Sequence, residues 1–343
     1  MSARVRQFVA VGAALSLLAG VARAEPDVVL RVSSVAPEGS SWAREFAAFG
    51  RAVEGATNGH VRIKWYLNGV AGDELEQEER LRRGQLDGAT SGQMLCERVA
   101  PSMRLTRLPG VFQNRDEATD VLARLQPRLE AEAHQAGFVL PITVSMGPDV
   151  IFSRTPIRTM DELKKAHLWR WDLDEVGIAT SRDMGMQATP VPIFAAASAY
   201  DGGKLDGFLA IPTAALAFQW TAQARYLTDL RGSYLWGCLV FSERAFGKLA
   251  ISQQQAIRSA AAQMGARFDD VQRQVDEALL GGLLRKQGVQ PVPPSAGFRA
   301  EYFAAARATR ERIGAQLVGK DLLDKALRML ADYRAEHPLP AGH

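Results

Sequence analysis

The sequence has few of the residues that usually build a metal or catalytic centre. Its five histidines are scattered, with no pair at the spacing of metal ligands. It contains no HExxH, CxxC or EF-hand loop and no Gly-x-Ser-x-Gly nucleophile elbow. Residues 314–320 resemble a phosphate-binding loop, but Asp321 stands where a serine or threonine would bind magnesium. We therefore expect no metal site, no cofactor and no enzymatic activity.

Neighbouring carboxylates are present but give no sign of acid–base chemistry. The pairs Asp172/Asp174 and Glu78/Glu79 are more typical of a solvated surface than of a catalytic couple. An enzyme whose site has no recognisable motif is the least favoured of the three functions that we consider below. We keep it because folds made of two lobes can host catalysis.

After the first 24 residues there is no hydrophobic run of the ~18 residues needed to span a membrane. Within those 24 residues, Arg4 and Arg6 precede an uncharged apolar stretch that is itself too short for a span. Ala22-Arg23-Ala24 then gives the small-x-small pattern of a cleavage site. We expect a signal peptide over residues 1–24, cleaved after Ala24, and a periplasmic protein without a membrane span.

The chain also has no net charge once the expected leader is removed. The chain has 41 Lys+Arg and 38 Asp+Glu, but three arginines and no acids lie in the first 24 residues. The mature chain therefore has 38 charges of each sign. A nucleic-acid partner is not expected, because it requires a clustered basic patch.

Cysteine is scarce, with only Cys96 and Cys238 in 343 residues. In an oxidising compartment the two could form one disulfide. Their spacing does not show whether the two Cα atoms come close enough, so two buried free thiols are the alternative, and the one we favour at this point.

A repeated pentapeptide is the most informative feature that is present. Gly84-Gln85-Leu86-Asp87-Gly88 recurs as residues 203–207 with a lysine in second place. Each copy follows a helix-like stretch and starts a short apolar strand, and a glycine there can end the helix in a left-handed conformation. Ligands of open α/β sheets bind beyond the carboxyl ends of the strands, so two such units predict two loop rims that face each other across a cleft.

Strand-like and helix-like segments alternate along most of the chain, as in α/β lobes with helical crossovers. Residues 252–287 predict a helix interrupted only by glycines, longer than one small lobe. The expected strands are residues 28–35, 60–67, 138–145, 149–154 and 167–171, and the other expected helices are 42–53, 73–83, 115–136, 299–313 and 321–333.

Eight short motifs in order resemble the DctP-type solute-binding proteins of tripartite ATP-independent periplasmic (TRAP) transporters. They lie at residues 54–59, 68–72, 86–88, 108–112, 156–164, 189–192, 205–207 and 241–246. The resemblance implies a two-lobe, periplasmic-binding-protein-like α/β fold with a ligand cleft, crossing strands and a long lobe-spanning helix. It implies lobe I at 25–147 plus about 236–270, lobe II at 148–235 plus about 271–337, and a tail at 338–343.

This sequence differs from the family at the positions where family members bind a substrate carboxylate. The usual arginine on the strand after the Asp-Leu-Lys turn becomes Trp169 when counted forward and Arg170 when counted back. Neighbours on a strand face opposite sides, so only one of them is expected in the pocket. The family's asparagine becomes Ala210, and a polar position on the first loop becomes Val35. The ligand is therefore not expected to be a simple C4-dicarboxylate.

The predicted ligand contacts combine these positions with nearby rim residues and aromatics. They are Val35, Ser91, Gln93, Phe152, Trp169, Arg170, Trp171, Phe208, Ala210, Pro212 and Trp236. By resemblance, the protein receives a small organic ligand and delivers it to TRAP membrane subunits. The alternative is a periplasmic carrier of a largely apolar ligand that works with another partner, such as a helical-repeat protein.

Overall fold

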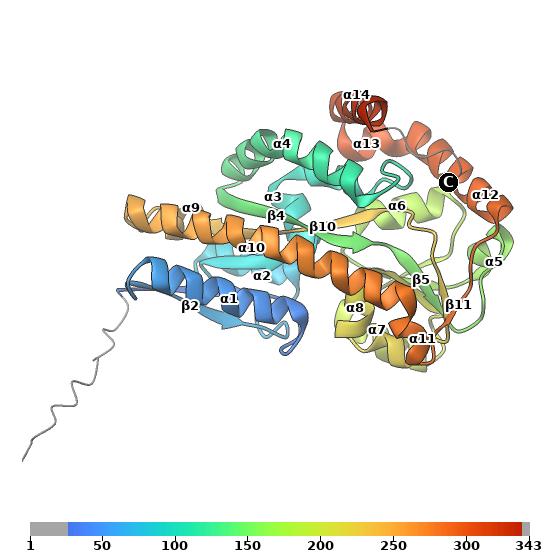
Figure 1. Cartoon of the computed structure of the whole chain (residues 1–343), viewed down its shortest axis with the longest axis horizontal. Coiled ribbons are helices and arrows are strands. Elements are labelled where there is room, and N and C mark those ends of the chain that lie inside the picture. Colours follow the sequence, from blue (N-terminus) through green and yellow to red (C-terminus); the bar gives the residue numbers. More distant parts are fainter. Residues whose placement is uncertain (1–26, 338–343) are drawn as a thin grey trace, which may run out of the picture.

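The computed structural model describes residues 27–337 as two lobes, each built around its own sheet (Figure 1). The predicted leader, residues 1–24, and the predicted tail, residues 338–343, fall outside the described residues. Among the residues described, none of the helices combines the length and apolar character that a membrane crossing needs. The predicted two-lobe α/β fold is confirmed.

Lobe I contains a five-stranded mixed sheet in the order β2-β1-β3-β10-β4. Strand β1 pairs in parallel with β2 and β3, whereas β10 runs antiparallel to β3 and β4. The strands are β1 (Val28–Ser33), β2 (Val61–Tyr66), β3 (Gly88–Ser91), β4 (Phe138–Pro148) and β10 (Tyr234–Ser242).

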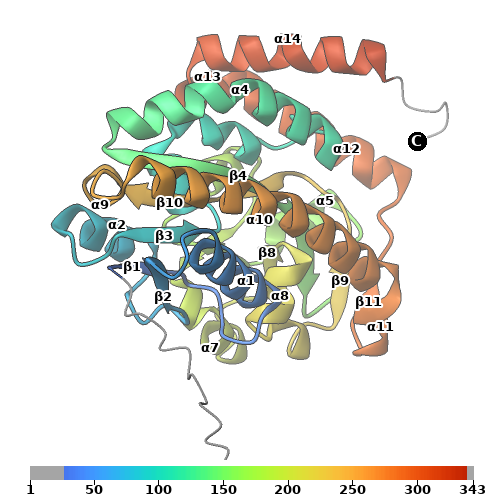
Figure 2. The same ribbon diagram turned by 60° about the vertical axis from the view of Figure 1, so that its left-hand side comes forward.

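Helices cover both faces of the lobe I sheet and bury two separate apolar cores. One face carries α1 and α10, and the other carries α2, α3, η1 and α4 (Figure 2). The lobe I helices are α1 (Ser41–Ala56), α2 (Glu74–Arg83), α3 (Met94–Val99), η1 (Pro101–Arg107), α4 (Arg115–Gln135), α9 (Glu243–Phe246) and α10 (Ile251–Ala278).

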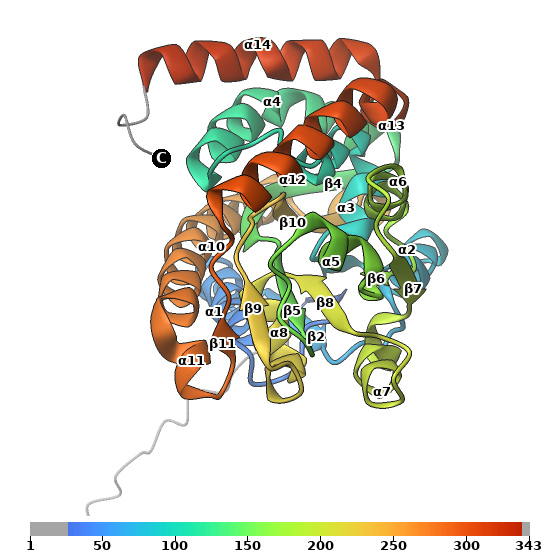
Figure 3. The same cartoon turned by 90° about the vertical axis from the view of Figure 1, so that its right-hand side faces the viewer.

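Lobe II contains a six-stranded sheet in the order β11-β9-β5-β8-β6-β7 (Figure 3). Its strands are β5 (Val150–Ser153), β6 (Leu168–Trp171), β7 (Ala188–Val191), β8 (Gly207–Ala210), β9 (Tyr226–Thr228) and β11 (Gln290–Pro291). Its helices are α5 (Met160–Lys165), α6 (Glu175–Asp183), η2 (Ile193–Ala195), α7 (Ala196–Asp201), α8 (Pro212–Ala217), η3 (Trp220–Ala222), η4 (Leu279–Leu283), α11 (Leu284–Lys286) and α12 (Ala296–Thr309).

The two copies of the repeated pentapeptide have the same local geometry. Gly84 and Gly203 end their helices with φ of 73° and 74°. The carboxylate of Asp87 accepts the backbone N–H of Arg31 at 2.9 Å, and that of Asp206 accepts the N–H of His167 at 2.8 Å. Each aspartate thus ties the start of its strand, β3 or β8, to the neighbouring parallel strand. The repeat places two equivalent strand ends, one in each lobe.

The long predicted helix is α10, which crosses the molecule from lobe I and continues into lobe II as η4 and α11 (Figure 1). Its Gly265 lies against β4, where an added Cβ would stand 2.8 Å from the Ile142 side chain. A glycine is needed there for close packing. The regular helix ends at η4, where Gly282 has a φ of 142°. We therefore expect any bend to occur at η4 and not at Gly265.

The last helices do not all belong with lobe II, where residues 271–337 were expected. Helix α12 packs on lobe II, but the chain then continues through η5 (Arg310–Gly314) and α13 (Ala315–Val318) to α14 (Lys320–Glu336). Helix α14 packs its apolar face on the lobe I core beside α4 (Figures 2 and 3). The reason is that its buried leucines complete the core under α4, which a local pattern does not reveal.

The two cysteines form a disulfide that joins α3 to β10 within lobe I. Their Cα atoms lie 5.9 Å apart, within the range of ordinary disulfides. The bond closes a loop with a sequence separation of 142 residues. Loops of that length lose much entropy when they are cross-linked in the unfolded chain.

We expect the double substitution Cys96→Ala/Cys238→Ala to lower the free energy of unfolding by about 2–4 kcal/mol. Urea unfolding monitored by circular dichroism measures it. Wild-type protein unfolded in dithiothreitol is the control, because it keeps both sulfur atoms and loses only the bond. A loss below about 1 kcal/mol in both samples would contradict the prediction.

Candidate functional site

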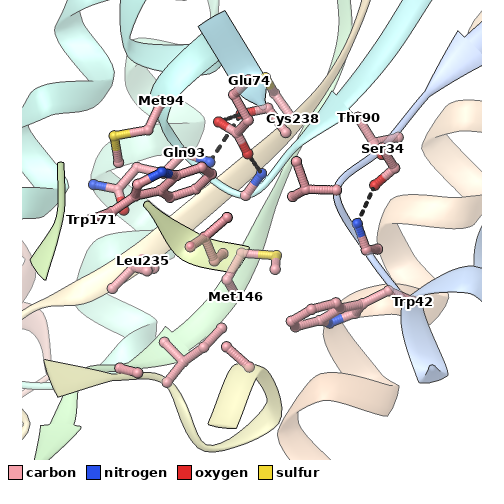
Figure 4. A pocket seen from close by; sticks show the side chains of 18 of the residues that line it. Ser34, Trp42, Glu74, Thr90, Gln93, Met94, Met146, Trp171, Leu235 and Cys238 are labelled. Carbon is pink, nitrogen blue, oxygen red and sulfur yellow. Dashed lines mark hydrogen bonds between the residues drawn. The ribbon is translucent and has the colours of Figure 1, made fainter. Parts of the chain in front are cut away.

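A cavity lies where the two lobes meet, at the carboxyl ends of parallel strands from both sheets. Lobe I contributes the loop after β1, with Ser34 and Val35, and the loop after β3, with Ser91 and Gln93. Lobe II contributes the ends of β6 and β8. The crossing strands β4 and β10 and helix α10 complete the wall (Figure 4). The volume is about 120 Å³.

Most of the wall is apolar. Figure 4 shows Trp42, Met146, Leu235 and Met94 around the space, with Ser34 and Thr90 at one side and Gln93 and Trp171 at another. The apolar side chains that border the cavity include Trp42, Phe46, Ile142, Val144, Met146, Ile193, Phe218, Trp220, Leu235, Met264 and Phe268. Such a wall suits an apolar molecule that is oriented by a few polar groups.

A column of stacked rings supports the lobe II side of the cavity. The ring of Trp220 lies parallel to that of Phe208, with centroids 4.8 Å apart and an interplanar angle of 3°. Phe218 stacks on Trp220 from the cavity side, and Tyr200 stacks on Phe208 further from it. The ring of Trp169 packs against that of Trp220, with centroids 4.8 Å apart and an interplanar angle of 58°. These contacts leave Trp169 little rotational freedom.

Strand β6 presents three successive residues to the cavity. Trp169 and Trp171 belong to the apolar cluster on one face of the strand, and the indole Nε1 of Trp169 donates to the carbonyl of Val191 at 2.9 Å. Arg170 lies on the opposite face and donates from Nε to Ser181 at 3.3 Å. We had expected only one of the adjacent residues Trp169 and Arg170 to border the cavity. That expectation was wrong, because the cavity extends around the end of this short strand.

Arg107 and Arg170 form a buried ionic cluster with Asp149 and Asp174 at one end of the cavity. Arg107, from lobe I, bonds to Asp149 at 2.9 Å and also to Asp174 of lobe II. Arg170 Nη1 lies 3.6 Å from a carboxylate oxygen of each aspartate. Asp149, between β4 and β5, also accepts from the hydroxyl of Ser233 at 2.9 Å. The cluster therefore links the two lobes, next to the two chain segments at Asp149 and Ser233 that pass from one lobe to the other.

The members of this cluster fix one another's charge. Burial alone would lower the pKa of Arg107, but the carboxylates of Asp174 and Asp149 raise it above its ordinary value. Burial would raise the pKa of Asp174, yet Arg107 and Arg170 hold it below its usual range. Burial and then the nearby Arg107 lower the pKa of Arg170. Two cations and two carboxylates thus balance in the folded protein.

Glu74, the first residue of α2, places its carboxylate at the start of α3, next to the cavity. Its carboxylate accepts from the Ser91 hydroxyl at 2.5 Å and from the backbone N–H groups of Gly92 and Leu95 at 2.7 and 3.0 Å. Burial raises the pKa of Glu74, and these hydrogen bonds oppose the rise. The backbone N–H groups of Gly92 and Leu95 at the start of α3 are therefore already paired within the protein (Figure 4).

The sequence matches the DctP family, described as bacterial extracellular solute-binding protein, family 7, over residues 32–316. The chain belongs to this family. A solute-binding protein of Roseobacter denitrificans is 20% identical over 261 residues, which are 76% of this chain and 79% of that protein. One from a Sulfitobacter strain is 24% identical over 277 residues, covering 77% of this chain and 81% of its own.

Solved structures with the same fold include DctP-type receptors. DctPAm from Advenella mimigardefordensis, in complex with galactonate, superposes with a TM-score of 0.83 at 20% identity, covering 90% of this chain and 99% of its own. DctP7 of Bordetella pertussis, which binds pyroglutamic acid, gives 0.79 at 19% identity, covering 88% and 99%. At this identity the likeness shows the fold alone.

Seven of the eleven predicted contacts border the cavity of this DctP-family protein. They are Val35, Ser91, Gln93, Trp169, Arg170, Trp171 and Ala210. Four lie elsewhere. Phe152 and Phe208 are paired across β5 and β8 inside lobe II, Trp236 packs into the lobe I core, and Pro212 starts α8. Leu209 and Leu235 do border the cavity, and strand alternation turns the adjacent side chains of Phe208 and Trp236 away from it.

Two carboxylates expected on the surface are buried instead. Asp174 caps α6 by accepting from the N–H of Gly177 at 2.8 Å, and it also belongs to the ionic cluster. Glu78 is buried between Arg82 and Arg98. Their sequence neighbours Asp172 and Glu79 are exposed. The expectation was wrong for one member of each pair, because arginines supply the opposite charges that make burial of these carboxylates possible.

Sequence reasoning also missed Arg107, Asp149, Glu74 and Trp42 at the cavity. Arg107 and Asp149 are 42 positions apart, and neither belongs to a recognisable motif. Trp42 was expected only as the first residue of the helix at 42–53. Its indole donates to Gln272 of α10 at 3.2 Å, and its ring also borders the cavity. Only their position in the folded chain reveals these roles.

Glu97, on α3 next to the ionic cluster, gives this end of the cavity a pH dependence. Burial and then the charge of Asp174 raise its pKa to about 7, although Arg107, Gln93 and Arg104 oppose the rise. The folded protein therefore binds a proton at Glu97 that the unfolded chain releases near pH 4.5. The contribution of Glu97 to stability is largest below about pH 4.5 and falls as the pH rises to about 7.

We expect the substitution Glu97→Gln to remove this dependence. Glutamine keeps an oxygen that accepts from Gln93 Nε2 but does not titrate. Relative to the wild type, the variant should gain up to roughly 3 kcal/mol of unfolding free energy between about pH 4.5 and pH 7, since each pKa unit is worth about 1.4 kcal/mol. Urea unfolding across this range measures the difference. A difference that is constant with pH would contradict the assignment.

Proposed function

We propose that this DctP-family protein is the periplasmic receptor of a TRAP transporter, and that it captures one small organic solute between its lobes and delivers it to the membrane subunits. The observation that carries the proposal is the shared cavity, which takes its wall from strand ends of both lobes. A molecule held there contacts both lobes at once, so its binding favours the closed arrangement. Family membership supports a receptor over an enzyme.

The ligand contacts that we propose are the seven predicted residues at the cavity together with the apolar wall. Val35, Trp169 and Ala210 stand at three positions where the resemblance to the family implies polar side chains that bind the ligand. Family membership favours a TRAP partner over a carrier that works with a helical-repeat protein. The cavity itself fits the apolar ligand of that alternative, so ligand type and transport partner are separate questions.

Closure around a solute is tested by small-angle X-ray scattering. One sample is the protein as purified from the periplasm, and the other is the same protein stripped of small molecules by unfolding and refolding with the disulfide intact. We expect the stripped protein to have the larger radius of gyration, with the change centred on η4, since hinge closure is the usual response of two-lobe receptors. Identical radii, together with no small molecule released on unfolding, would contradict the proposal.

A further inference from the structure

Trp171 has a buried polar group without a partner. Its side chain is only 8% exposed, at the carboxyl end of β6, and it borders the cavity beside Met94 and Gln93 (Figure 4). Among the described residues, no atom accepts a hydrogen bond from its indole Nε1. The neighbouring Trp169 differs, because its Nε1 donates to Val191. An indole N–H can only donate, and burying it unpaired costs about 1–3 kcal/mol. An acceptor from outside the chain would remove this cost.

The charges around the cavity disfavour an anion as that acceptor. The only cations on the described wall are Arg107 and Arg170, and both face Asp149 and Asp174. Glu74 adds a third carboxylate. An anionic ligand would therefore find no uncommitted positive charge there, and a buried charge without a partner costs several kcal/mol.

The size and walls of the cavity restrict the rest of the molecule. Its volume of about 120 Å³ is close to that of the ~150 Å³ apolar cavity known to admit benzene. The rings of Phe218 and Trp220 provide a flat apolar wall. The hydroxyl of Thr90 and the Nε of Arg107 are two further buried groups on the wall without a hydrogen-bond partner. The hydroxyl can donate or accept, and the charge of Arg107 is already balanced by Asp149 and Asp174, so neither group requires a charged ligand.

We propose that the solute is an uncharged, mostly apolar molecule of about the size of one six-membered ring, with an oxygen acceptor that receives the N–H of Trp171. This inference rests on the proposed receptor function and defines its substrate class. Trp171 acts as the specificity-determining donor, because it provides the one buried N–H on the β6 side that the chain leaves free among the described residues. The ionic cluster excludes organic acids.

Three probes of similar size separate charge from hydrogen bonding: benzamide, benzoate and toluene. Their dissociation constants are measured by calorimetry on stripped protein, for the wild type, for Trp171→Phe and for Trp169→Phe. We expect benzoate to bind at least tenfold more weakly than benzamide. Trp171→Phe should weaken benzamide by roughly three- to tenfold more than it weakens toluene, the value of one neutral hydrogen bond. Trp169→Phe is the matched control and should leave the ratio of benzamide to toluene unchanged, because the Trp169 N–H is already used.

Two results would overturn this assignment and leave the receptor proposal intact: benzoate binding as tightly as benzamide, or Trp171→Phe weakening toluene and benzamide equally. If none of the three probes binds, the proposed substrate class is also wrong. The scattering experiment then decides independently whether the protein closes around a different solute.

Discussion

Replacing Arg107 with methionine is expected to lower the free energy of unfolding by about 3–5 kcal/mol, the usual effect of removing one partner from a buried ion pair. The guanidinium is only 3% exposed, and its loss leaves Asp149 and Asp174 with Arg170 alone, at 3.6 Å. Urea unfolding at neutral pH with the disulfide intact measures the effect.

The matched control is Arg83→Met, which removes an arginine from an exposed ion pair with Glu79. Such pairs contribute about 0–1 kcal/mol, so this variant should be close to the wild type. Adding Asp174→Asn to Arg107→Met should recover part of the loss, because asparagine keeps the oxygen that caps α6 and removes the unpaired charge. Equal effects at Arg107 and Arg83 would show that the buried cluster does not stabilise the fold.

Replacing Trp169 with alanine is expected to weaken binding of the solute that co-purifies with the protein by roughly 2 kcal/mol or more, within the range of a buried aromatic hot spot. The ring borders the cavity and leans on Trp220, so its loss removes a contact surface and loosens the wall behind it. Calorimetry with the solute, once mass spectrometry has identified it, gives the change in affinity.

Trp236→Ala is the control for this variant. Trp236 is also a buried tryptophan but lies in the lobe I core, outside the described wall of the cavity. Both variants should lose stability, and only Trp169→Ala should lose affinity. If Arg170→Ala reduces affinity more than Trp169→Ala does, the apolar reading of the site is wrong and an organic acid becomes the expected cargo.

The sequence predicted most of what depends on local pattern. The repeated Leu-Asp-Gly units have the expected geometry, and the helix expected at residues 42–53 is present as α1. These features depend on contacts within a few residues or on one neighbouring strand. Motif order was enough to give the family, and with it the two-lobe fold.

What the sequence did not predict depends on residues that are distant along the chain. Residues 236–270 were expected in lobe I, but β10 was not recognised there as a strand, and α14 was assigned to the wrong side of the molecule. Both complete a sheet or a core whose other parts come from far earlier in the chain. At the site, Arg107 meets Asp174 across 67 positions. No periodicity or motif links such residues, and only the packing of the two lobes brings them together.

Native mass spectrometry of the protein purified from the periplasm tests the central claim most directly. The account predicts one low-mass, uncharged organic molecule bound per chain, which is retained in the Trp236→Ala variant and lost in Trp169→Ala. A chain that carries no small molecule, or a bound molecule that Trp169→Ala does not affect, would contradict the claim that the cavity between the lobes is the binding site.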